Sequence, residues 1–278
     1  MLRELKDYEK LRGLLAENPP AAAMITYTLF HQTPDPTEPF RLCLVDDTEN
    51  PGCVLVVGWG NLFFTRDPDT FDLALEYFDS TAYRELIEGT FRDDTELRAH
   101  FLEAYRFAGL QESCCERLLK VGEVVWRTRC WVHYWDSPPP REPAVPLRPL
   151  APEHAHVVEA HWEFGEHDED SVGYIRWRIE TGPTLAFYDE RGEPGAWCIT
   201  HGSGSMGHIY TRRAYRRRGL ALEIAYGIIR AVLEGGWLPH AHIKQVNEPS
   251  LALARKVGLK RGDDVSWISV RRGRPPGG

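Results

Sequence analysis

Hydrophobic residues recur along the chain at helical spacing in some segments and as alternating or continuous apolar runs in others. In the first half, helical spacing near residues 3–17, 70–88 and 95–108 accompanies three strand-like runs, which are Arg41–Val45, Val54–Trp59 and Val124–Tyr134. The pattern predicts a region in which helices and strands are mixed.

The second half begins with a short predicted strand, followed by two predicted helices and then by further strands. A short strand at Val145–Leu150 precedes a helix from about Pro152 to Trp162 and a second helix from near Ser171 to Gly182-Pro183. Turn-rich sequences then connect three predicted strands, which are Thr184–Tyr188, Gly195–Thr200 and His208–Thr211.

Helical spacing returns after the third of these strands. Apolar residues recur from Ala221 to Leu233 until Gly235-Gly236 ends the pattern. A further strand carrying His240 and His242 leads to a last helix after Asn247. The order of elements predicts an α+β fold.

A proline-rich segment, Ser137–Pro143, is the clearest boundary, because it cannot sustain the hydrogen bonds of a helix or sheet. We therefore expect a first domain over residues 1–136, a linker over 137–144 and a second domain over 145–270. Residues 271–278 read as a flexible tail.

Charge is distributed unevenly along the 278-residue chain. The formal net charge is −8, yet five arginines crowd into one short segment: Arg212, Arg213, Arg216, Arg217 and Arg218. An acidic surface around a local basic patch disfavours nucleic acid and favours a smaller polyanion.

The sequence favours a cytoplasmic protein. Its six cysteines form neither a C-x-x-C pair nor the density of a disulfide scaffold. The opening residues are charged with both signs, and no apolar run approaches the ~20 residues that span a bilayer, so we expect no membrane partner. The oligomeric state stays open, with a homodimer as one alternative.

The segment Arg216–Ala221 combines a small-residue turn with the start of an amphipathic helix, directly after a predicted strand. Backbone N–H groups at a helix start have no intrahelical acceptor and carry the positive end of the helix dipole. Gly219 would let the backbone approach a ligand closely. The segment therefore predicts a diphosphate site, although a solvated arginine-rich surface is the alternative.

A second element, Asn247–Leu259, follows that helix at the distance one more strand requires. Together the two elements resemble the acyl-CoA-binding core of the Gcn5-related N-acetyltransferase (GNAT) superfamily, in which an R-x-x-G-x-G/A loop and helix precede an N-x-x-A/S…K-x-G-F segment. Tyr174-Ile175, Gly195–Cys198 and the end of the Tyr210 strand are similar to the glycine N-acyltransferase-like branch. The resemblance covers residues 147 to 270.

The resemblance implies a GNAT-like fold with a mixed, mostly antiparallel twisted sheet flanked by helices. We expect a tandem of two such domains, the first without a cofactor loop, since Arg106–Gln111 closes a predicted helix there instead of opening one. An unrelated α/β domain is the alternative.

Acetyl-CoA or another acyl-CoA is the implied cosubstrate, with no metal. The expected cofactor-binding residues are Tyr210, Thr211, Arg216, Arg217, Arg218, Gly219, Leu220, Ala221, Asn247 and Ser250.

The implied reaction is direct transfer of an acyl group to the amine of a small molecule or amino acid within a ternary complex. The family polarises the thioester carbonyl with a backbone N–H at a strand bulge, which here points to Tyr210 or Thr211. The amine must be neutral, so His208 is the first candidate base, with Tyr210 beside it and His201 as a further candidate. A histidine that only packs and hydrogen-bonds is the alternative.

Two usual proton-transfer residues are absent from the matching positions. Ala214 stands where glycine acyltransferases carry a carboxylate, and Ala254 stands where many relatives carry a tyrosine acid. Loss of the acid is tolerable because a thiol with a pKa near ~8.5 leaves readily as thiolate. An acyl-CoA-binding regulator with weak catalysis is therefore the leading alternative, followed by a nucleic-acid module.

Several other polar residues allow two interpretations. Asn247 should cap the last helix and could also meet the pantetheine arm. His240 and His242 share a strand face but lack a third ligand for a metal. Arg176 and Arg178 suit either an acceptor carboxylate or solvent. The same choice, an amine site or a solvated loop, applies to five acidic residues: Glu163, Glu166, Asp168, Glu169 and Asp170.

Overall fold

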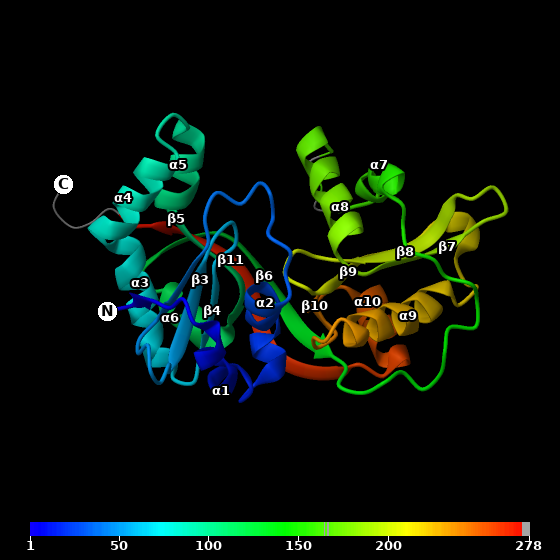
Figure 1. Ribbon diagram of the computed structural model, residues 1–278, viewed down its shortest axis with the longest axis horizontal. Coiled ribbons are helices and arrows are strands. Elements are labelled where there is room, and N and C mark those ends of the chain that lie inside the picture. Colours follow the sequence, from blue (N-terminus) through cyan, green and yellow to red (C-terminus); the bar gives the residue numbers. More distant parts are fainter. Residues whose placement is uncertain (164, 166, 274–278) are drawn as a thin grey trace. The chain divides into compact units, whose positions relative to one another are not determined.

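The computed structural model describes residues 1–163, 165 and 167–273 (Figure 1). The chain divides into two compact units. The first holds Met1–Ile25, Pro36–Trp131 and the residues from Asp263 onward, and the second holds Thr26–Asp35 and Val132–Gly262. The chain thus crosses between units several times, whereas the sequence suggested a single boundary near residue 137.

The first unit contains a four-stranded antiparallel sheet in chain order, made of β1 (Arg3–Glu4), β2 (Leu42–Val45), β3 (Cys53–Val57) and β4 (Leu62–Thr65). All five residues of β3 are buried, because both faces of this strand are covered. Helices and one more strand complete the core: α3 (Phe71–Asp79), α4 (Thr81–Thr90), α5 (Thr95–Leu102), β5 (Ala104–Gln111) and α6 (Glu112–Leu118).

Three predicted helices of this unit were wrong in extent. Residues 3–17 form β1, a 3-10 turn at Tyr8–Leu11 and the short α1 (Arg12–Leu15), and α2 (Pro19–Phe30) was not predicted. Residues 70–88 break at Ser80, whose hydroxyl caps α4 by accepting the Tyr83 N–H at 3.2 Å.

The predicted helix over residues 95–108 stops at Leu102, and the chain continues as strand β5. Its residues alternate between the two faces of the sheet, with Tyr105 and Phe107 in the core. Arg106–Gln111 therefore lies in a strand and does not close a helix.

The second unit is built on a three-stranded antiparallel sheet of β7 (Thr184–Tyr188), β8 (Pro194–Thr200) and β9 (Met206–Thr211). Trp197 and Ile199 of β8 pack against α7 (Ala155–Glu159) and α8 (Glu169–Thr181). Their neighbours Ala196 and Cys198 pack against α9 (Leu220–Glu234) on the opposite face, as strand alternation requires. Figure 1 shows this central sheet between the two helical layers.

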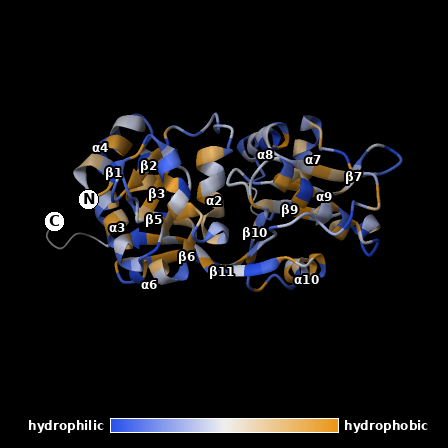
Figure 2. Ribbon diagram, turned by 60° about the horizontal axis from the view of Figure 1, so that its bottom comes forward, coloured by the Kyte–Doolittle hydropathy of each residue, from blue (hydrophilic) through white to orange (hydrophobic). Residues whose placement is uncertain are grey.

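A second sheet has the strand order β10-β6-β11-β5, and its long strands β6 (Gly122–Tyr134) and β11 (Lys260–Arg272) contribute residues to both units. Strand β10 (His240–Lys244) precedes α10 (Glu248–Val257). Strand β9 lies at the edge of one sheet and β10 at the edge of the other, with no pairing between them in the described chain. Strands as well as helices carry both polar and apolar positions, and β11 includes a hydrophilic stretch (Figure 2).

The borders of several predicted elements shift in the second unit. Residues 145–150 contribute a single bridge, Arg148 to Ala186, in place of a strand. The helix expected from Pro152 ends at Glu159. Asp168, not Ser171, caps α8, because its carboxylate accepts the Ser171 N–H at 2.8 Å.

The segments expected to be a linker and a tail are partly held by the fold. Glu223 on α9 accepts hydrogen bonds from the Arg141 guanidinium at 2.6 and 2.8 Å and from the Ala144 N–H at 2.7 Å. Arg271 and Arg272 belong to β11, and the remainder of the expected tail, residues 274–278, lies outside the described residues. Within the described chain, no helix is both long and apolar enough to cross a bilayer.

Candidate acyl-CoA site

Strand β9 contains a bulge next to the predicted loop. Tyr210 pairs with Trp197 and Gly207 pairs with Ile199, so His208 and Ile209 together oppose the single residue Cys198. His208 has a φ of 48°, a left-handed conformation that is costly for a residue with a Cβ. The sequence predicted a bulge before the loop, and the structure places it at His208 and Ile209.

The bulged strand leaves outward-facing amides at its free edge. The Arg212 N–H donates to the Gly195 carbonyl of β8 at 2.9 Å. Because N–H groups alternate between the two edges of an antiparallel strand, the Thr211 N–H points away from β8, toward the edge without a strand partner. The Tyr210 N–H points toward β8, as the Arg212 N–H does. Of the two residues proposed for carbonyl polarisation, Thr211 is the one whose amide faces outward.

The loop after β9 ends in an exposed helix start. Gly219 is the N-cap of α9, with a φ of 79° that favours glycine, and Arg217 also has a positive φ of 63°. Among the described residues, none accepts a hydrogen bond from the N–H groups of this stretch, which are those of Arg217, Arg218, Gly219, Leu220 and Ala221. These donors lie at the positive end of a 15-residue helix.

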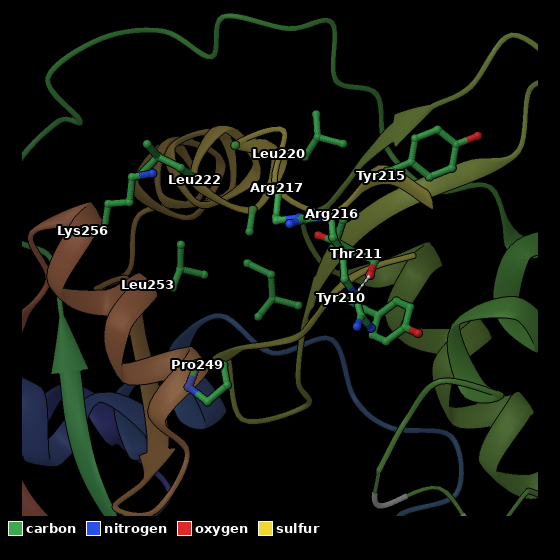
Figure 3. Close-up of a pocket in the computed structure, with 13 residues that line it drawn as sticks. Tyr210, Thr211, Tyr215, Arg216, Arg217, Leu220, Leu222, Pro249, Leu253 and Lys256 are labelled. Carbon is green, nitrogen blue, oxygen red and sulfur yellow. Dashed lines mark hydrogen bonds between the residues drawn. The ribbon is translucent and has the colours of Figure 1, made fainter. Parts of the chain in front are cut away.

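A pocket of about 510 Å³ opens in front of these donors (Figure 3). Its walls are the end of β9, the loop, the first turn of α9 and one face of α10. The lining is mainly apolar, and the side chains of Arg216, Arg217 and Lys256 bring positive charge to it. A ligand with an apolar arm and a polyanionic end fits this distribution.

Seven of the ten predicted cofactor-binding residues line the pocket: Tyr210, Thr211, Arg216, Arg217, Gly219, Leu220 and Ala221. The other three have different surroundings. Arg218 lies over the Tyr215 ring at 5.3 Å, and Asn247 caps α10 by accepting the Ser250 N–H at 3.2 Å. The capping role predicted for Asn247 is thereby confirmed.

Sequence reasoning placed Asn247 and Ser250 at the cofactor but missed the three α10 residues that line the pocket. Pro249, Leu253 and Lys256 are spaced four and three residues apart, which places them on one helix face. The sequence contains this helical spacing, but nothing in the sequence alone showed that this face of the helix meets α9.

The three candidate catalytic residues do not share one wall. Tyr210 and Thr211 line the pocket, whereas His208 faces the segment after α7, with its ring 4.5 Å from Trp162 and 4.5 Å from His201. Both ring nitrogens of His208 are shielded from solvent and have no hydrogen-bond partner in the described part of the chain. Leaving a buried imidazole without a hydrogen-bond partner is energetically costly.

Burial keeps this histidine and three others near it neutral. It lowers the pKa of His208 well below 6.5, with His201 adding to the effect. Burial also lowers the pKa of His201 to about 4, of His240 to about 4 and of His242 to about 3. Nowhere in the described chain do three potential ligands gather as a metal site, His240 and His242 included.

Two of the five acidic residues make internal contacts, while Glu169 and Asp170 lie exposed in the first turn of α8. Glu163 pairs with Lys244 at 2.7 Å, Asp168 caps α8, and Glu166 lies outside the described residues. A carboxylate that sequence reasoning missed, Glu159, is buried and accepts the Ser171 hydroxyl at 2.9 Å. Only the tertiary fold identifies it, because a glutamate on a short helix carries no distinguishing sequence signal.

Arg178 is not available to an acceptor carboxylate. It is fully buried, and its guanidinium donates to the Thr200 carbonyl at 2.8 Å, the Thr181 hydroxyl at 3.1 Å and the Tyr27 hydroxyl at 3.3 Å. The suggested pairing of Arg178 with a substrate is therefore wrong, and Arg176 lies exposed on the same helix.

Comparison with known proteins finds a family match over part of the chain. Residues 185–268 match the family model described as FR47-like protein. The human protein Glycine N-acyltransferase-like protein 2 is 27% identical over 107 residues, which is 38% of this chain and 36% of that protein. The match thus spans about a third of the length of this curated relative.

Solved structures share the fold over nearly the whole chain. A Drosophila protein has a TM-score of 0.62 at 15% identity, covering 97% of this chain and 98% of that one. A tandem GNAT protein from the clavulanic acid biosynthesis pathway has a TM-score of 0.57 at 14% identity, covering 99% and 100%. Together with the partial sequence match, these findings support a GNAT superfamily assignment.

The shared fold confirms the predicted α+β class, and the tandem neighbour fits the division of this chain into two units. The FR47-like match includes β9, the Gly219 loop, α9 and α10, which are the elements that build the pocket. The likeness of the solved structures establishes the fold alone. Which residues of this chain bind a ligand or act on it stays a prediction.

The neutral histidines predict a pH-dependent stability. Because their pKa values are lower in the folded protein than the ordinary 6.5, the unfolded chain binds more protons between about pH 4 and 6.5. The free energy of unfolding should fall as the pH drops from 6.5 toward 4 and should be unaffected by these groups above 6.5. Urea unfolding at pH 7.5, 6.5 and 5.5 measures this slope.

The matched variant is His240→Asn. Between pH 6 and 5 it should reduce the slope of the free energy of unfolding against pH by up to about 1.4 kcal/mol per pH unit. The interval avoids the titration of carboxylates such as Glu159 and Glu223, whose pKa values are below 4.5. Identical slopes in both proteins would contradict the assignment of a buried neutral His240.

Arg178→Leu should lower the free energy of unfolding by about 2 kcal/mol or more, because buried acceptors at Thr200 and Tyr27 lose their donor. Arg176→Leu, on the exposed face of the same helix, is the control and should change stability by less than about 0.5 kcal/mol. Equal stability of the two variants in urea titrations would show that the buried network is dispensable.

Proposed function

We propose that the protein is an acyl-CoA-dependent N-acyltransferase that moves an acetyl or other acyl group to the amine of a small molecule or amino acid. The observation that carries this proposal is the row of unbonded N–H groups at the start of α9, which opens into a pocket bordered by Arg216, Arg217 and Lys256. Backbone donors and cations together suit a diphosphate. Similarity to the GNAT superfamily supports the same class of ligand.

The apolar part of the pocket suits the remainder of the cosubstrate. Ile209, Leu222 and Leu253 line the space between the free edge of β9 and α10. A pantetheine arm lying there would bring its thioester toward the bulge. The outward Thr211 N–H would then donate to the carbonyl oxygen, where negative charge develops as the amine attacks.

The proposed reaction is a direct transfer in a ternary complex. The amine nitrogen forms a bond with the thioester carbon, the carbon–sulfur bond breaks, and the sulfur leaves as a thiolate. The amine must lose a proton, for which we propose His208, a neutral ring with two unpartnered nitrogens. Its lowered pKa makes it a weak base, so it suits an acceptor that reaches the site already uncharged.

The second candidate function is an acyl-CoA-binding regulator with weak catalysis. It is favoured by Ala214 and Ala254, which replace the usual proton-transfer residues, and by the low basicity of the buried histidines. The predicted cytoplasmic location, the small acceptor and the lack of nucleic-acid and membrane partners stay predictions under either function.

Thiol release measured with a panel of acyl-CoAs and amines separates the two functions. Amine-dependent release of CoA supports the transferase. Tight acyl-CoA binding in calorimetry without release supports the regulator, and the absence of CoA binding refutes both. Mass spectrometry of a copurified ligand adds the identity of the acyl group.

Gly219→Glu should abolish CoA binding, because it places a side chain and a negative charge in front of the proposed diphosphate donors. Gly192→Glu is the matched control: Gly192 has an almost identical φ of 80° and the same open surroundings but lies in the turn between β7 and β8. Isothermal titration should show wild-type affinity for the control only. Unchanged affinity of Gly219→Glu would refute the placement of the site.

His208→Gln should lower kcat by about 10²-fold or more while leaving the Kd for acyl-CoA within about twofold, because His208 does not line the pocket. The loss should be smallest for the least basic amines in the panel. A kcat equal to that of wild type for every amine would remove His208 from the mechanism.

A further inference from the structure

Exposed large apolar side chains are concentrated at one place in the first unit. Seven are exposed in the described chain, and four of them lie between residues 121 and 126: Val121, Val124, Val125 and Trp126. Val124, Val125 and Trp126 are 42%, 49% and 44% exposed, and all three belong to strand β6. Neighbouring strand residues point to opposite faces, so this segment is uncovered on both faces. A contiguous apolar surface of this kind indicates an interface.

The same segment has a free backbone edge. On one side β6 lies beside β11, where the Arg127 side chain donates to the Ser266 hydroxyl at 2.9 Å. On the other side its neighbour is β10, a strand of five residues. The Trp135 N–H donates to the Pro239 carbonyl at 3.0 Å, which places β10 at the far end of β6. In the described chain, nothing pairs with the outer edge of Glu123–Arg129, where a further strand can add.

We propose that Glu123–Arg129, hereafter the β6 edge, pairs with the same segment of a second copy to form an antiparallel, two-fold symmetric dimer. In an isologous contact each pair of residues occurs twice, so the segment must be complementary to itself. The sequence Glu123-Val124-Val125-Trp126-Arg127-Thr128-Arg129 meets this condition when Trp126 lies opposite its own copy.

This register places compatible side chains on each face. Trp126 meets the partner's Trp126, with Val124 opposite the partner's Thr128 on the same face. On the other face, Glu123 lies opposite the partner's Arg129. Both side chains are exposed, at 75% and 55%, and each also has a partner in its own copy, Arg271 at 2.8 Å for Glu123 and Glu112 at 3.8 Å for Arg129.

Neighbouring registers are less favourable. Centring the contact on Arg127 would place two arginines directly opposite each other, which is destabilising. Centring it on Val125 would pair Glu123 with Arg127, which is only 23% exposed and held by Ser266 and Glu112, whereas Arg129 is 55% exposed and 3.8 Å from its own Glu112. Charge complementarity therefore selects the Trp126-centred register. The remaining charges at the edge oppose indiscriminate strand addition.

The test is sedimentation velocity of the full chain over a range of concentrations. Wild type should form dimers, and Trp126→Lys should raise the dimer Kd by about 30-fold or more, as expected for a central aromatic contact. Val246→Lys is the control, since Val246 is 86% exposed in the second unit and should leave the Kd unchanged. A wild type that stays monomeric at all concentrations, or a Trp126→Lys dimer of wild-type affinity, overturns the proposal.

A charge exchange tests the register itself. Glu123→Arg and Arg129→Glu should each weaken the dimer, and the double variant should recover most of the lost affinity because the pair is restored with reversed sign. Additive losses in the double variant would overturn the Trp126-centred pairing. Acyl-CoA binding by each variant, measured separately, reports that the chain is folded and does not depend on the dimer.

Discussion

Backbone amides without internal acceptors are the constraint around which the second unit is organised. A helix start always exposes such groups, but a protein can cap them with a side chain or bury them. Among the described residues neither occurs: the turn with positive φ at Gly219 and Arg217 belongs to the wall of a pocket. The sheet behind them is rigid, because β8 is buried along its entire length between two helical layers. The donors are thus fixed before any ligand arrives, which reduces the entropic cost of binding.

The region around β9 concentrates polar groups that lack solvent and partners. The bulge forces His208 into a left-handed conformation and turns its ring into an aromatic and histidine environment. Such strain and desolvation are destabilising, and a fold retains them where they serve a purpose. The large apolar cores on both faces of β8, which include Trp197, offset that cost.

The sequence predicted the second unit better than the first, for a physical reason. Gly219 and Asn247 mark helix starts through local backbone and capping chemistry, which one segment specifies by itself. The break at Ser80 and the change from α5 to β5 depend on tertiary packing, which overrides helical spacing in short segments. Long-range pairings were beyond the sequence: the return of β11 to the first unit and the α10 face with Lys256 arise only when distant segments meet.

The hydrogen bonds of Glu223 to the proline-rich segment limit where a fragment of the second half can begin. It is 8% exposed, and its three hydrogen bonds come from Arg141 and Ala144, whose loss would leave an uncompensated charge one turn beyond Gly219. Arg141 also lies over the Tyr226 ring at 5.0 Å. A recombinant fragment of the second half must therefore begin upstream of Arg141. A cut at the apparent end of the linker would remove the hydrogen bonds that hold α9, the helix whose first turn carries the amides.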